Sequence, residues 1–599
     1  MKTENFGSLK RKSIVYSVIV ATMVILLGRL FQMQILNRVE YDMKATDNSI
    51  KSIELQPLRG VFYDRNYKVL VSNVPAYTIR ITPAYFDTSL NKILEAVIGT
   101  EPGFVKNLLQ KNKIYSRYLP VKVRRGVDFK VIAWYEENSE HLPGVDYIIE
   151  MQRFYPASIM ASHTFGYTKE ISPEQLAREK DFYKPGDYVG HSGIERTYEK
   201  LLSGKKGYKY VLVDSRQRQI SRYLDGKDDI APVKGNDLVL GIEASAQRVA
   251  EEEFIGKRGG LAAIDPSSGE IIAMVSAPDF DLNRFSYFTP RSFLDSIYSN
   301  PYTPLFNRAT MSVHPPGSTF KMLSAIAALD MGVITTSTTI TCGGGFTFGR
   351  FFKCMHNHGT INVVTAIEKS CNSFFYRLIY KIGMDKWKEY STKFGFGRMI
   401  GIDLTEEVAG LIPDENYYIK RYGDNWPRSI MASLGVGQGE VSVSPLQLAL
   451  YGALIANNGR TKTPHIVRGY IDDDTEELIP LEYEDINTGV SQEAMDVVRK
   501  AMYLVVNGAG TARHIKLPDI DICGKTGTAQ NPHGKDHAWF VGFAPYENPK
   551  IAIAVLVENA GFGGTHAAPI AKKVIQAYMN SFKGERKTFK DEIAVVKVN

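Results

Sequence analysis

The stretch His314-Pro-Pro-Gly-Ser-Thr-Phe-Lys-Met-Leu-Ser-Ala-Ile-Ala-Ala-Leu-Asp-Met-Gly332 decides the fold of this chain. Its prolines and first glycine predict a turn, and Gly332 is a typical helix stop, so the stretch predicts a helix from about Ser318. The interior is apolar on nearly every side, which predicts burial. Ser318 and Lys321, three residues apart, lie on one face at the N-terminal end, where the helix dipole favours an anionic oxygen. Burial disfavours an ammonium, so Lys321 is a candidate base for Ser318.

A Ser-x-x-Lys pattern alone is not specific, because Ser203-Gly-Lys-Lys206 is a second copy whose glycine and lysine neighbours predict a solvated loop. Two further elements follow the first copy: Ser370-Cys-Asn372, before an apolar run, and Lys525-Thr-Gly-Thr528, at the start of a predicted strand. Singly, Ser370 and Asn372 are typical of caps and turns, and Lys525 of a solvated surface. Together, in this order, the three elements predict one catalytic site.

Composition places the chain among folded proteins. It has 599 residues, 44% hydrophobic and 23% charged, which excludes disorder, collagen-like repeats and small disulfide scaffolds. This length suits several domains. The formal charge of +7 comes from 72 basic and 65 acidic residues, too mixed to indicate a nucleic-acid binder.

The first forty residues predict a membrane anchor. An apolar run, 14–27, follows a basic start, and semi-polar residues continue it to about 36. We expect a cytoplasmic tail at 1–12 and a transmembrane helix at 13–36, with the rest of the chain outside the cytoplasm, because positive residues stay inside. A cleaved signal peptide is the alternative, since the apolar core is short, but no small-residue cleavage site follows it.

Residues 37–235 mix short β-rich runs with helical stretches and many glycine or proline breaks, which predicts an elongated α/β module. The pattern of apolar runs and turn residues changes after Gly235. Residues 261–265 and 270–276 flank a Pro-Ser-Ser-Gly turn and predict a hairpin.

A second hairpin is predicted near the C-terminus, from 537–544 and 551–558, with a helix from about Ala567 to Phe582 behind it. Hairpins interleaved with long helices favour an antiparallel sheet covered by helices, so we predict an α+β fold for residues 236–584. Residues 585–599 are expected to form a C-terminal tail.

The three elements together resemble the motifs of penicillin-binding proteins and serine β-lactamases. In the first module, Arg59-Gly-Val-Phe-Tyr-Asp-Arg65, Arg153-Phe-Tyr-Pro156 and Gly190-His-Ser-Gly-Ile-Glu195 resemble the pedestal domain of class B penicillin-binding proteins, which β-lactamases lack. Two later strings are most similar to the rod-elongation type, penicillin-binding protein 2: Gly437-Gln-Gly439 with Ser444-Pro-Leu-Gln447, and His537-Ala-Trp-Phe-Val-Gly-Phe543.

The resemblance implies a peptidoglycan D,D-transpeptidase that is also a target of β-lactams. Ser318 would attack the penultimate D-Ala carbonyl of a stem peptide, with Lys321 as base. Ser370 would relay the proton and Asn372 would hold the substrate amide and Lys321. The substrate carboxylate would bind at Lys525, Thr526, Gly527 and Thr528, and backbone N–H groups of Ser318 and Thr528 would form the oxyanion hole. No cofactor is implied for catalysis.

Soft ligands gather between the first two elements: Cys342, Cys354, His358 and Cys371. Within thirty residues, such a set suits tetrahedral zinc. Some relatives of the penicillin-binding protein 2 type carry zinc on a histidine before glycine and on the cysteine inside the second motif, which His358 and Cys371 match. Cys342 and Cys354 stand where relatives often have aspartates, so a structural zinc, a disulfide and free thiols all stay open.

Two competing functions share these motifs: a serine β-lactamase, and a membrane-anchored, non-catalytic β-lactam sensor or scaffold. The pedestal, the anchor and the lack of a deacylating Glu motif after Asn372 disfavour the first, and the short tail at 1–12 disfavours the second. No glycosyltransferase module precedes the pedestal. By resemblance we therefore expect a SEDS-family polymerase, RodA, and the elongation complex as partners at the inner membrane, with the catalytic domain in the periplasm.

Overall fold

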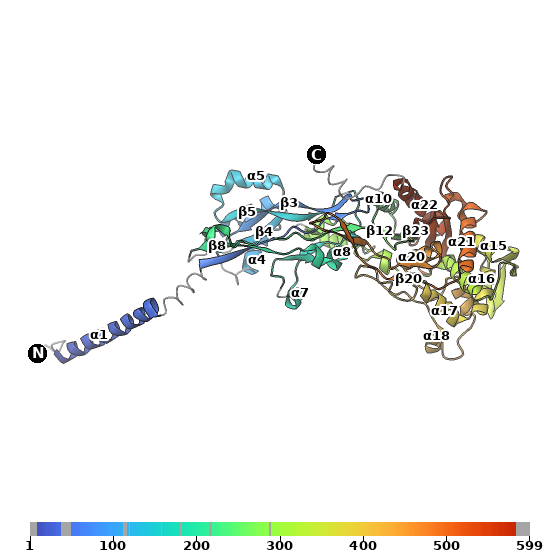
Figure 1. Cartoon of the computed structure of the whole chain (residues 1–599), viewed down its shortest axis with the longest axis horizontal. Coiled ribbons are helices and arrows are strands. Elements are labelled where there is room, and N and C mark those ends of the chain that lie inside the picture. The colour runs from blue at the N-terminus through green and yellow to red at the C-terminus, as the bar shows by residue number, and fades with distance from the viewer. Residues whose placement is uncertain are drawn as a thin grey trace.

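The computed structural model describes residues 9–36, 49–111, 117–118, 120–156, 158–179, 182–214, 219–286 and 289–582. The predicted C-terminal tail at 585–599 and residues 1–8 of the predicted cytoplasmic tail lie outside the described residues. The molecule is elongated, with helix α1 (Leu9–Phe31) at one end and the helix-rich second half of the chain at the other (Figure 1).

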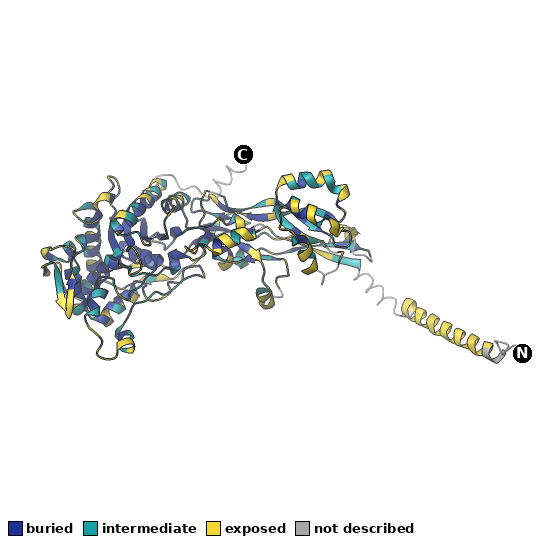
Figure 2. Cartoon of the chain, turned by 180° about the vertical axis from the view of Figure 1, so that it is seen from behind, coloured by how far each residue is buried: buried dark blue, intermediate teal, exposed yellow. Residues whose placement is uncertain are grey.

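Helix α1 passes into a π-helical turn, η1 (Gln32–Leu36), at the place of the predicted anchor. The segment Lys12–Ile35 is long and apolar enough to cross a membrane, and none of it is buried against the rest of the described chain. Figure 2 shows it as an exposed helix apart from the other elements. An apolar helix with no protein partner is typical of a membrane span or a signal sequence.

The first module is built on one long strand, β3 (Val69–Ile81), which pairs antiparallel with β4 (Val121–Val127) and β5 (Val145–Phe154). Its own small core lies under α3 (Asn91–Ile98), α4 (Phe104–Lys111) and α5 (Phe129–Asn138). A separate three-stranded sheet is formed by β1 (Ile50–Leu55), β8 (Gly207–Val213) and β9 (Gln219–Arg222).

A shared sheet ties the two modules together. Strand β10 (Asp237–Leu240) pairs parallel with β2 (Phe62–Tyr63) and antiparallel with β18 (Val467–Ile471), and β2 pairs with β3. Strands from both sides of residue 235 therefore belong to one seven-stranded sheet.

Arg59, Arg153 and Glu195, one from each pedestal string, meet beside this sheet. Both arginines donate from Nε to the carboxylate of Glu195 at 2.5 Å, and the Glu195 side chain is fully buried. Burial of a charge is tolerated when it is paired and hydrogen-bonded, so three sequence-distant strings form one ionic junction.

The second module is built on a five-stranded antiparallel sheet with the order β12-β11-β23-β22-β21. Both predicted hairpins are confirmed. Nearly every strand residue is buried, as expected for a sheet covered on both faces. The strand bounds are β11 (Gly259–Ile264), β12 (Ile271–Ala277), β21 (Cys523–Ala529), β22 (His537–Ala544) and β23 (Ile551–Val557).

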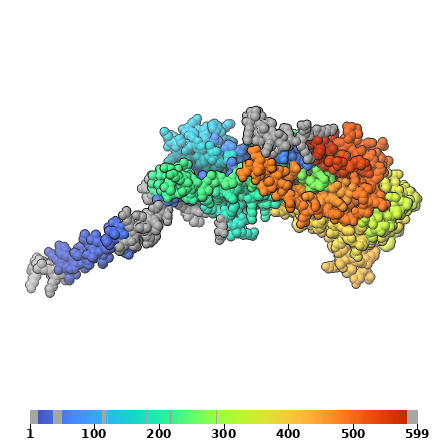
Figure 3. Space-filling view, viewed as in Figure 1, coloured from blue at the N-terminus to red at the C-terminus, as the bar shows by residue number. Residues whose placement is uncertain are grey.

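Helices cover this sheet. Helices α10 (Ala244–Glu253) and α22 (Gly563–Ser581) pack against each other and on the sheet, and Figure 3 shows the red α22 beside green residues from the start of the module. Helix α20 (Pro445–Ala456) packs on the central strands. Helices α14 (Lys321–Asp330), α16 (Asn372–Ile382) and α21 (Gln492–Asn507) pack together near β21.

Two helix starts differ from the sequence prediction. Helix α22 begins at Gly563, four residues before the predicted start. A Cβ at Gly563 would lie 2.1 Å from the Gly527 carbonyl oxygen, so glycine allows the start of this helix to approach β21 closely. The segment from Gly317 to Phe320 is a 3₁₀ turn, η6, and α14 proper starts at Lys321. Gly332, at φ +68°, follows its end as predicted.

Candidate active site

The turn that carries Ser318, η6 (Gly317–Phe320), is packed between two backbone segments. Gly317, at φ +57°, donates its N–H to the Gly437 carbonyl oxygen at 2.8 Å. A Cβ at Gly317 would lie 2.6 Å from the Thr528 carbonyl oxygen, and one at Gly437 would lie 2.3 Å from that of Gly317. Glycine at both positions therefore allows η6 to sit directly against strand β21.

The 3₁₀ turn brings the first motif together. Residues three apart eclipse in a 3₁₀ helix, and the Lys321 N–H donates to the Ser318 carbonyl oxygen. The Ser318 side chain is half-buried and, within the described part of the chain, its hydroxyl forms no hydrogen bond. Ser318 is thus left available to a ligand.

Lys321 is fully buried and is held by the second motif. Its Nζ donates to the Ser370 carbonyl oxygen at 2.8 Å, to Ser370 Oγ at 3.1 Å and to Asn372 Oδ1 at 2.6 Å. No carboxylate of a described residue forms an ion pair with it. Burial lowers the pKa of Lys321 to about 8.

Ser370 occupies a strained turn between α15 (Val363–Glu368) and α16. Its φ is +55°, the left-handed region that costs a residue with a Cβ about 1–3 kcal/mol. That conformation turns both its carbonyl and its hydroxyl toward Lys321. Asn372, at the start of α16, also donates from Nδ2 to the Lys353 carbonyl oxygen at 3.3 Å.

The third motif lies on the edge strand β21. Lys525 is fully buried, and within the described chain its Nζ donates to one acceptor, the Thr526 carbonyl oxygen, at 3.2 Å. Burial, and then the nearby Lys321, lower the pKa of Lys525 well below its ordinary value. The ammonium has further donors but no carboxylate partner among the described residues.

The rest of β21 is positioned by close contacts. Thr526 Oγ1 lies 2.8 Å from Thr511 Oγ1, and Thr528 Oγ1 accepts from the Gly563 N–H at 3.4 Å. A Cβ at Gly527 would lie 2.7 Å from the Pro316 carbonyl oxygen. The structure therefore brings together all eight residues predicted for catalysis and substrate binding, because η6 contacts β21 and Lys321 contacts Ser370 and Asn372.

Three residues to which the sequence analysis assigned no role also contact these motif segments. Gln438 Nε2 donates to the Thr528 carbonyl oxygen at 2.9 Å, and Trp539 Nε1 donates to that of Pro315 at 3.0 Å. Thr511 contacts Thr526 as described above. A polar residue between two glycines was the available signal for Gln438, because Gly-Gln-Gly predicts a tight turn around an exposed amide. Nothing in the sequence pointed to Thr511.

The cysteine cluster lies next to the second motif. Cys342 ends β13 (Thr339–Cys342), Cys354 follows β15 (Arg350–Lys353), His358 precedes β16 (Gly359–Asn362), and Cys371 caps α16. Their ligand atoms all lie within 4.8 Å of one another.

The spacing of these atoms fits a tetrahedral metal site. His358 Nδ1 lies 3.6 Å from both Cys342 Sγ and Cys354 Sγ, and the Sγ atoms of Cys354 and Cys371 are 3.9 Å apart. Zinc–sulfur bonds of about 2.3 Å place tetrahedral thiolates roughly 3.8 Å apart. None of the four cysteines of the chain, all within the described residues, forms a disulfide.

Family comparisons match both modules. The penicillin-binding protein transpeptidase domain matches residues 259–576, and the penicillin-binding protein dimerisation domain matches residues 54–240.

Whole-chain relatives agree with the domain matches. The peptidoglycan D,D-transpeptidase MrdA of Acinetobacter baumannii is 33% identical, covering 94% of this chain and 86% of that protein. MrdA of Escherichia coli is 30% identical, covering 90% of this chain and 89% of that protein. A complex between penicillin-binding protein 2 and MreC from Helicobacter pylori aligns with a TM-score of 0.76 at 28% identity, over 89% of this chain and 100% of that one. This chain belongs to the penicillin-binding proteins, and within them to the penicillin-binding protein 2 type.

Proposed function

We propose that this protein is a peptidoglycan D,D-transpeptidase that cross-links stem peptides through an acyl-enzyme on Ser318 during cell-wall elongation. The observation that carries the proposal is Lys321, a fully buried amine without a carboxylate partner among the described residues, held by Ser370 and Asn372 one turn from Ser318. The relatives named as D,D-transpeptidases, and a Pseudomonas aeruginosa penicillin-binding protein 2 structure at 28% identity with a TM-score of 0.67, also support it.

Acylation begins when Ser318 Oγ attacks the penultimate D-Ala carbonyl of a donor stem peptide. Neutral Lys321 takes the hydroxyl proton, a positioned transfer that typically contributes about 10²- to 10⁴-fold. The C–N bond to the terminal D-Ala breaks, and its nitrogen takes a proton relayed through Ser370. The products are an ester on Ser318 and free D-Ala.

The third motif holds the donor. Lys525 lacks a carboxylate partner among the described residues, so the terminal carboxylate of the substrate supplies the missing counter-charge, with Thr526 and Thr528 as hydroxyl donors. Backbone N–H groups of Ser318 and Thr528 stabilise the oxyanion. Gly527 leaves room for β21 to approach the turn that carries Ser318.

Cross-linking reverses the proton transfers of the acylation step. An amine of a second stem peptide attacks the ester, its lost proton returns through Lys321 to Ser318 Oγ, and a new peptide bond joins the two strands. A β-lactam enters at the same acylation step, because its amide takes the place of the D-Ala-D-Ala bond.

Intact-mass measurement of the detergent-solubilised chain after incubation with penicillin tests this function. We expect one long-lived adduct on Ser318 and none in Ser318→Ala, together with cross-linked product from peptidoglycan strands. Rapid drug turnover would instead identify a serine β-lactamase. A stable adduct without cross-linking by an active partner complex would identify a sensor or scaffold.

We also propose that Cys342, Cys354, His358 and Cys371 hold a structural zinc ion. The donor atoms support it, because three sulfurs and one ring nitrogen at these spacings match the tetrahedral set that zinc prefers. Cys371 lies between Ser370 and Asn372, so the ion would fix the turn that holds Lys321. It supplies no step of the reaction.

Metal analysis of the purified chain decides the zinc proposal. We expect about one zinc per chain and a lower Tm after chelation. Cys523, which is buried outside the cluster, provides the matched control: Cys342→Ser should lose the metal and Cys523→Ser should retain it. Metal-free protein with an unchanged Tm on chelation would contradict the proposal.

Finally, we propose that α1 is an uncleaved inner-membrane anchor with its N-terminus in the cytoplasm, so that both modules are periplasmic. The basic residues before the span support this orientation. We further propose a RodA-type SEDS polymerase as membrane partner. A chain of a peptidoglycan synthase complex that coordinates polymerization and crosslinking aligns with 96% of this chain at 25% identity, with a TM-score of 0.71, and supports this proposal. Protease protection in spheroplasts tests the orientation, and co-purification with the polymerase tests the partner.

A further inference from the structure

A buried carboxylate contacts the turn that precedes the nucleophile. Glu558 follows strand β23 directly, and its side chain is 6% exposed. Ser312 Oγ donates to Glu558 Oε1 at 2.7 Å, and His314 Nε2 lies 3.6 Å from the same oxygen. Ser312 and His314 are themselves linked, with 3.0 Å between Oγ and Nε2. The carboxylate thus contacts two residues of the segment that ends in Ser318.

Cations hold Glu558 in its charged form. Arg258 forms an ion pair with it through Nε, and Arg308 Nε lies 3.5 Å from Oε1. The Glu558 N–H also donates to the Arg258 carbonyl oxygen at 2.7 Å. Hydrogen bonds to a charged acceptor are stronger than neutral ones, so this carboxylate is a rigid anchor point for Ser312.

The His314 ring is fixed on its other side. It packs against the His537 ring in a tilted arrangement, with 4.0 Å between centroids and 37° between planes. His537 Nδ1 accepts the Asn559 N–H at 3.2 Å, which fixes that ring as the neutral tautomer protonated at Nε2. The His314 backbone also exchanges two hydrogen bonds with Val443, at 3.0 and 3.1 Å.

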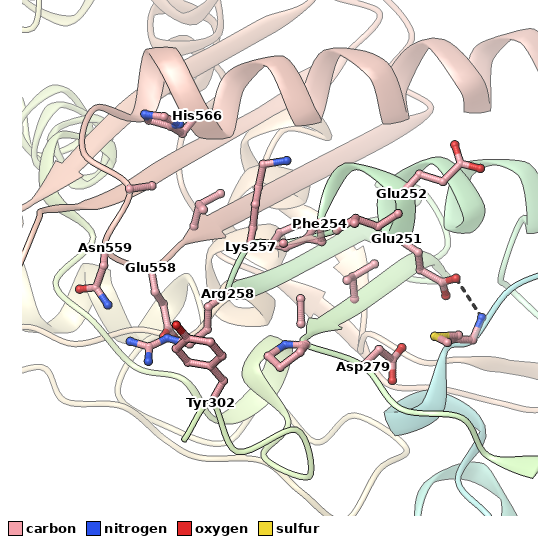
Figure 4. Close-up of a pocket in the computed structure, with 18 of the residues that line it drawn as sticks. Glu251, Glu252, Phe254, Lys257, Arg258, Asp279, Tyr302, Glu558, Asn559 and His566 are labelled. Atoms are coloured by element: carbon pink, nitrogen blue, oxygen red, sulfur yellow. Dashed lines mark hydrogen bonds and ion pairs between the residues drawn. The ribbon is translucent and has the colours of Figure 1, made fainter. Parts of the chain in front are cut away.

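The outer side of the cluster forms one wall of a cavity of about 840 Å³ at the end of the sheet. Figure 4 shows Glu558, Arg258 and Tyr302 together at one end of it, while Glu251 and Asp279 lie at the other. The cluster therefore lies between this cavity and the turn that carries Ser318, and none of the hydrogen bonds of Lys321 and Lys525 in the described chain goes to it.

We propose that Glu558 and His314 are positioning residues of the acylation step: the Glu558 carboxylate, through Ser312 and His314, holds the 312–317 turn so that Ser318 lies in its reactive position. The proposal rests on the proposed function. Neither residue touches the reacting atoms. Their effect is on geometry, since small misplacements of reacting groups are costly in rate.

The experiment measures acylation of the solubilised full chain by a fluorescent penicillin over a range of concentrations, which separates the acylation rate constant from the binding constant. Glu558→Gln keeps the shape and the Ser312 hydrogen bond but removes the charge. We expect its acylation rate constant to fall about 10- to 100-fold, with the binding constant changed less than about twofold.

Two further variants complete the design. Glu253→Gln is the matched control, because Glu253 also pairs with a cation across the α10–α22 layer, Lys573 at 2.6 Å, but does not contact the turn. It should acylate like the parent. Ser312→Ala removes the Ser312 contacts with Glu558 and His314 but keeps the Glu558 charge. It decides the matter if Glu558→Gln does not fold, as judged by Tm. We expect it to lower the same rate constant in the same direction.

A double-mutant cycle of Glu558→Gln with His314→Gln should be non-additive, because the two residues act through one turn. Unchanged acylation rate constants in folded Glu558→Gln and Ser312→Ala, or a change confined to the binding constant, would overturn the inference. A parent protein that is not acylated at all would overturn the proposed function, and this inference with it.

Discussion

The two Ser-x-x-Lys copies share a pattern and differ in the partner of the lysine. Lys321 is fully buried and contacts a hydroxyl, a carbonyl and an amide oxygen, but no carboxylate of a described residue. Lys206, in the pedestal, forms ion pairs with Asp187 and Glu54 and is 17% exposed. Ser203 Oγ is buried and forms no hydrogen bond within the described chain.

The contrast indicates that the charges around the lysine, rather than the Ser-x-x-Lys spacing, distinguish a candidate catalytic lysine from a structural one. A counter-charge fixes a lysine as a cation and removes it as a base, whereas a desolvated lysine among neutral acceptors can give up its proton. The same comparison extends to carboxylates: Glu195 has two arginine partners, and Asp279 forms no ion pair within the described residues.

The largest expected effect comes from removing the unpaired lysine. Lys321→Met keeps much of the side-chain volume but removes the base, so we expect penicillin acylation of Ser318 to fall at least about 10³-fold. The readout is adduct formation by intact mass. Lys206→Met should acylate at the parent rate, and equal losses in both variants would show that the two sites do not differ as argued.

The next largest effect is expected on the free energy of unfolding, from removing the buried charge of Glu195. Glu195→Gln leaves Arg153 without a carboxylate partner among the described residues and leaves Arg59 with Glu199 alone. Removing one partner of a buried ion pair typically costs about 3–5 kcal/mol. Denaturant unfolding of the solubilised chain measures it. Glu199→Gln is the control, because Glu199 is 15% exposed and its ion pair, among the described residues, is with Arg59 alone, so the loss should be smaller.

The main strands and the turn before Ser318 were predictable from sequence. Apolar runs around short turns predicted the β11–β12 and β22–β23 hairpins, because strands buried on both faces are apolar throughout. Glycine next to the nucleophile predicted a turn, although the 3₁₀ form of η6 was not foreseen.

Long-range partners were not predictable. Nothing near Lys206 in the sequence reveals Glu54, and nothing near Ser312 reveals Glu558, since these pairs are separated by more than a hundred residues. The solvated loop expected for Ser203-Gly-Lys-Lys206 is a loop, but its lysine is only partly exposed because Asp187 is drawn in from another segment. Pairing of charges follows tertiary contact, which sequence spacing does not encode.

A carboxylate without a cation should make stability depend on pH. Burial, partly offset by hydrogen bonds from Ser162 and the Phe280 N–H, raises the pKa of Asp279 to about 7. A raised acid pKa favours the folded state while the group is protonated, and this contribution is lost as pH rises from the unfolded pKa to about 7. Between pH 5 and 8 the chain should lose about 3 kcal/mol that Asp279→Asn does not lose.

Tm measured at both pH values gives this difference directly. The matched control is Asp281→Asn, two residues away and half-exposed in an ion pair with Arg284. It should follow the parent at both pH values. A parallel pH response of Asp279→Asn and the parent would show that Asp279 is ionised throughout, contrary to the expectation for an unpaired buried acid.

The smallest effect is expected at the paired lysine itself. Lys206→Met removes the ion pairs with Asp187 and Glu54, but Asp187 still accepts the Lys184 N–H at 2.8 Å and Glu54 keeps its ion pair with Lys184. Partly exposed pairs contribute about 1 kcal/mol or less, so the unfolding free energy should fall by about that amount, with acylation unchanged. Added salt should narrow the gap between parent and variant, because the lost attraction is screened. A salt-independent loss of several kcal/mol would mean that Lys206, like Lys321, is held mainly by burial, and the contrast between the two copies would then lie in their hydrogen-bond acceptors alone.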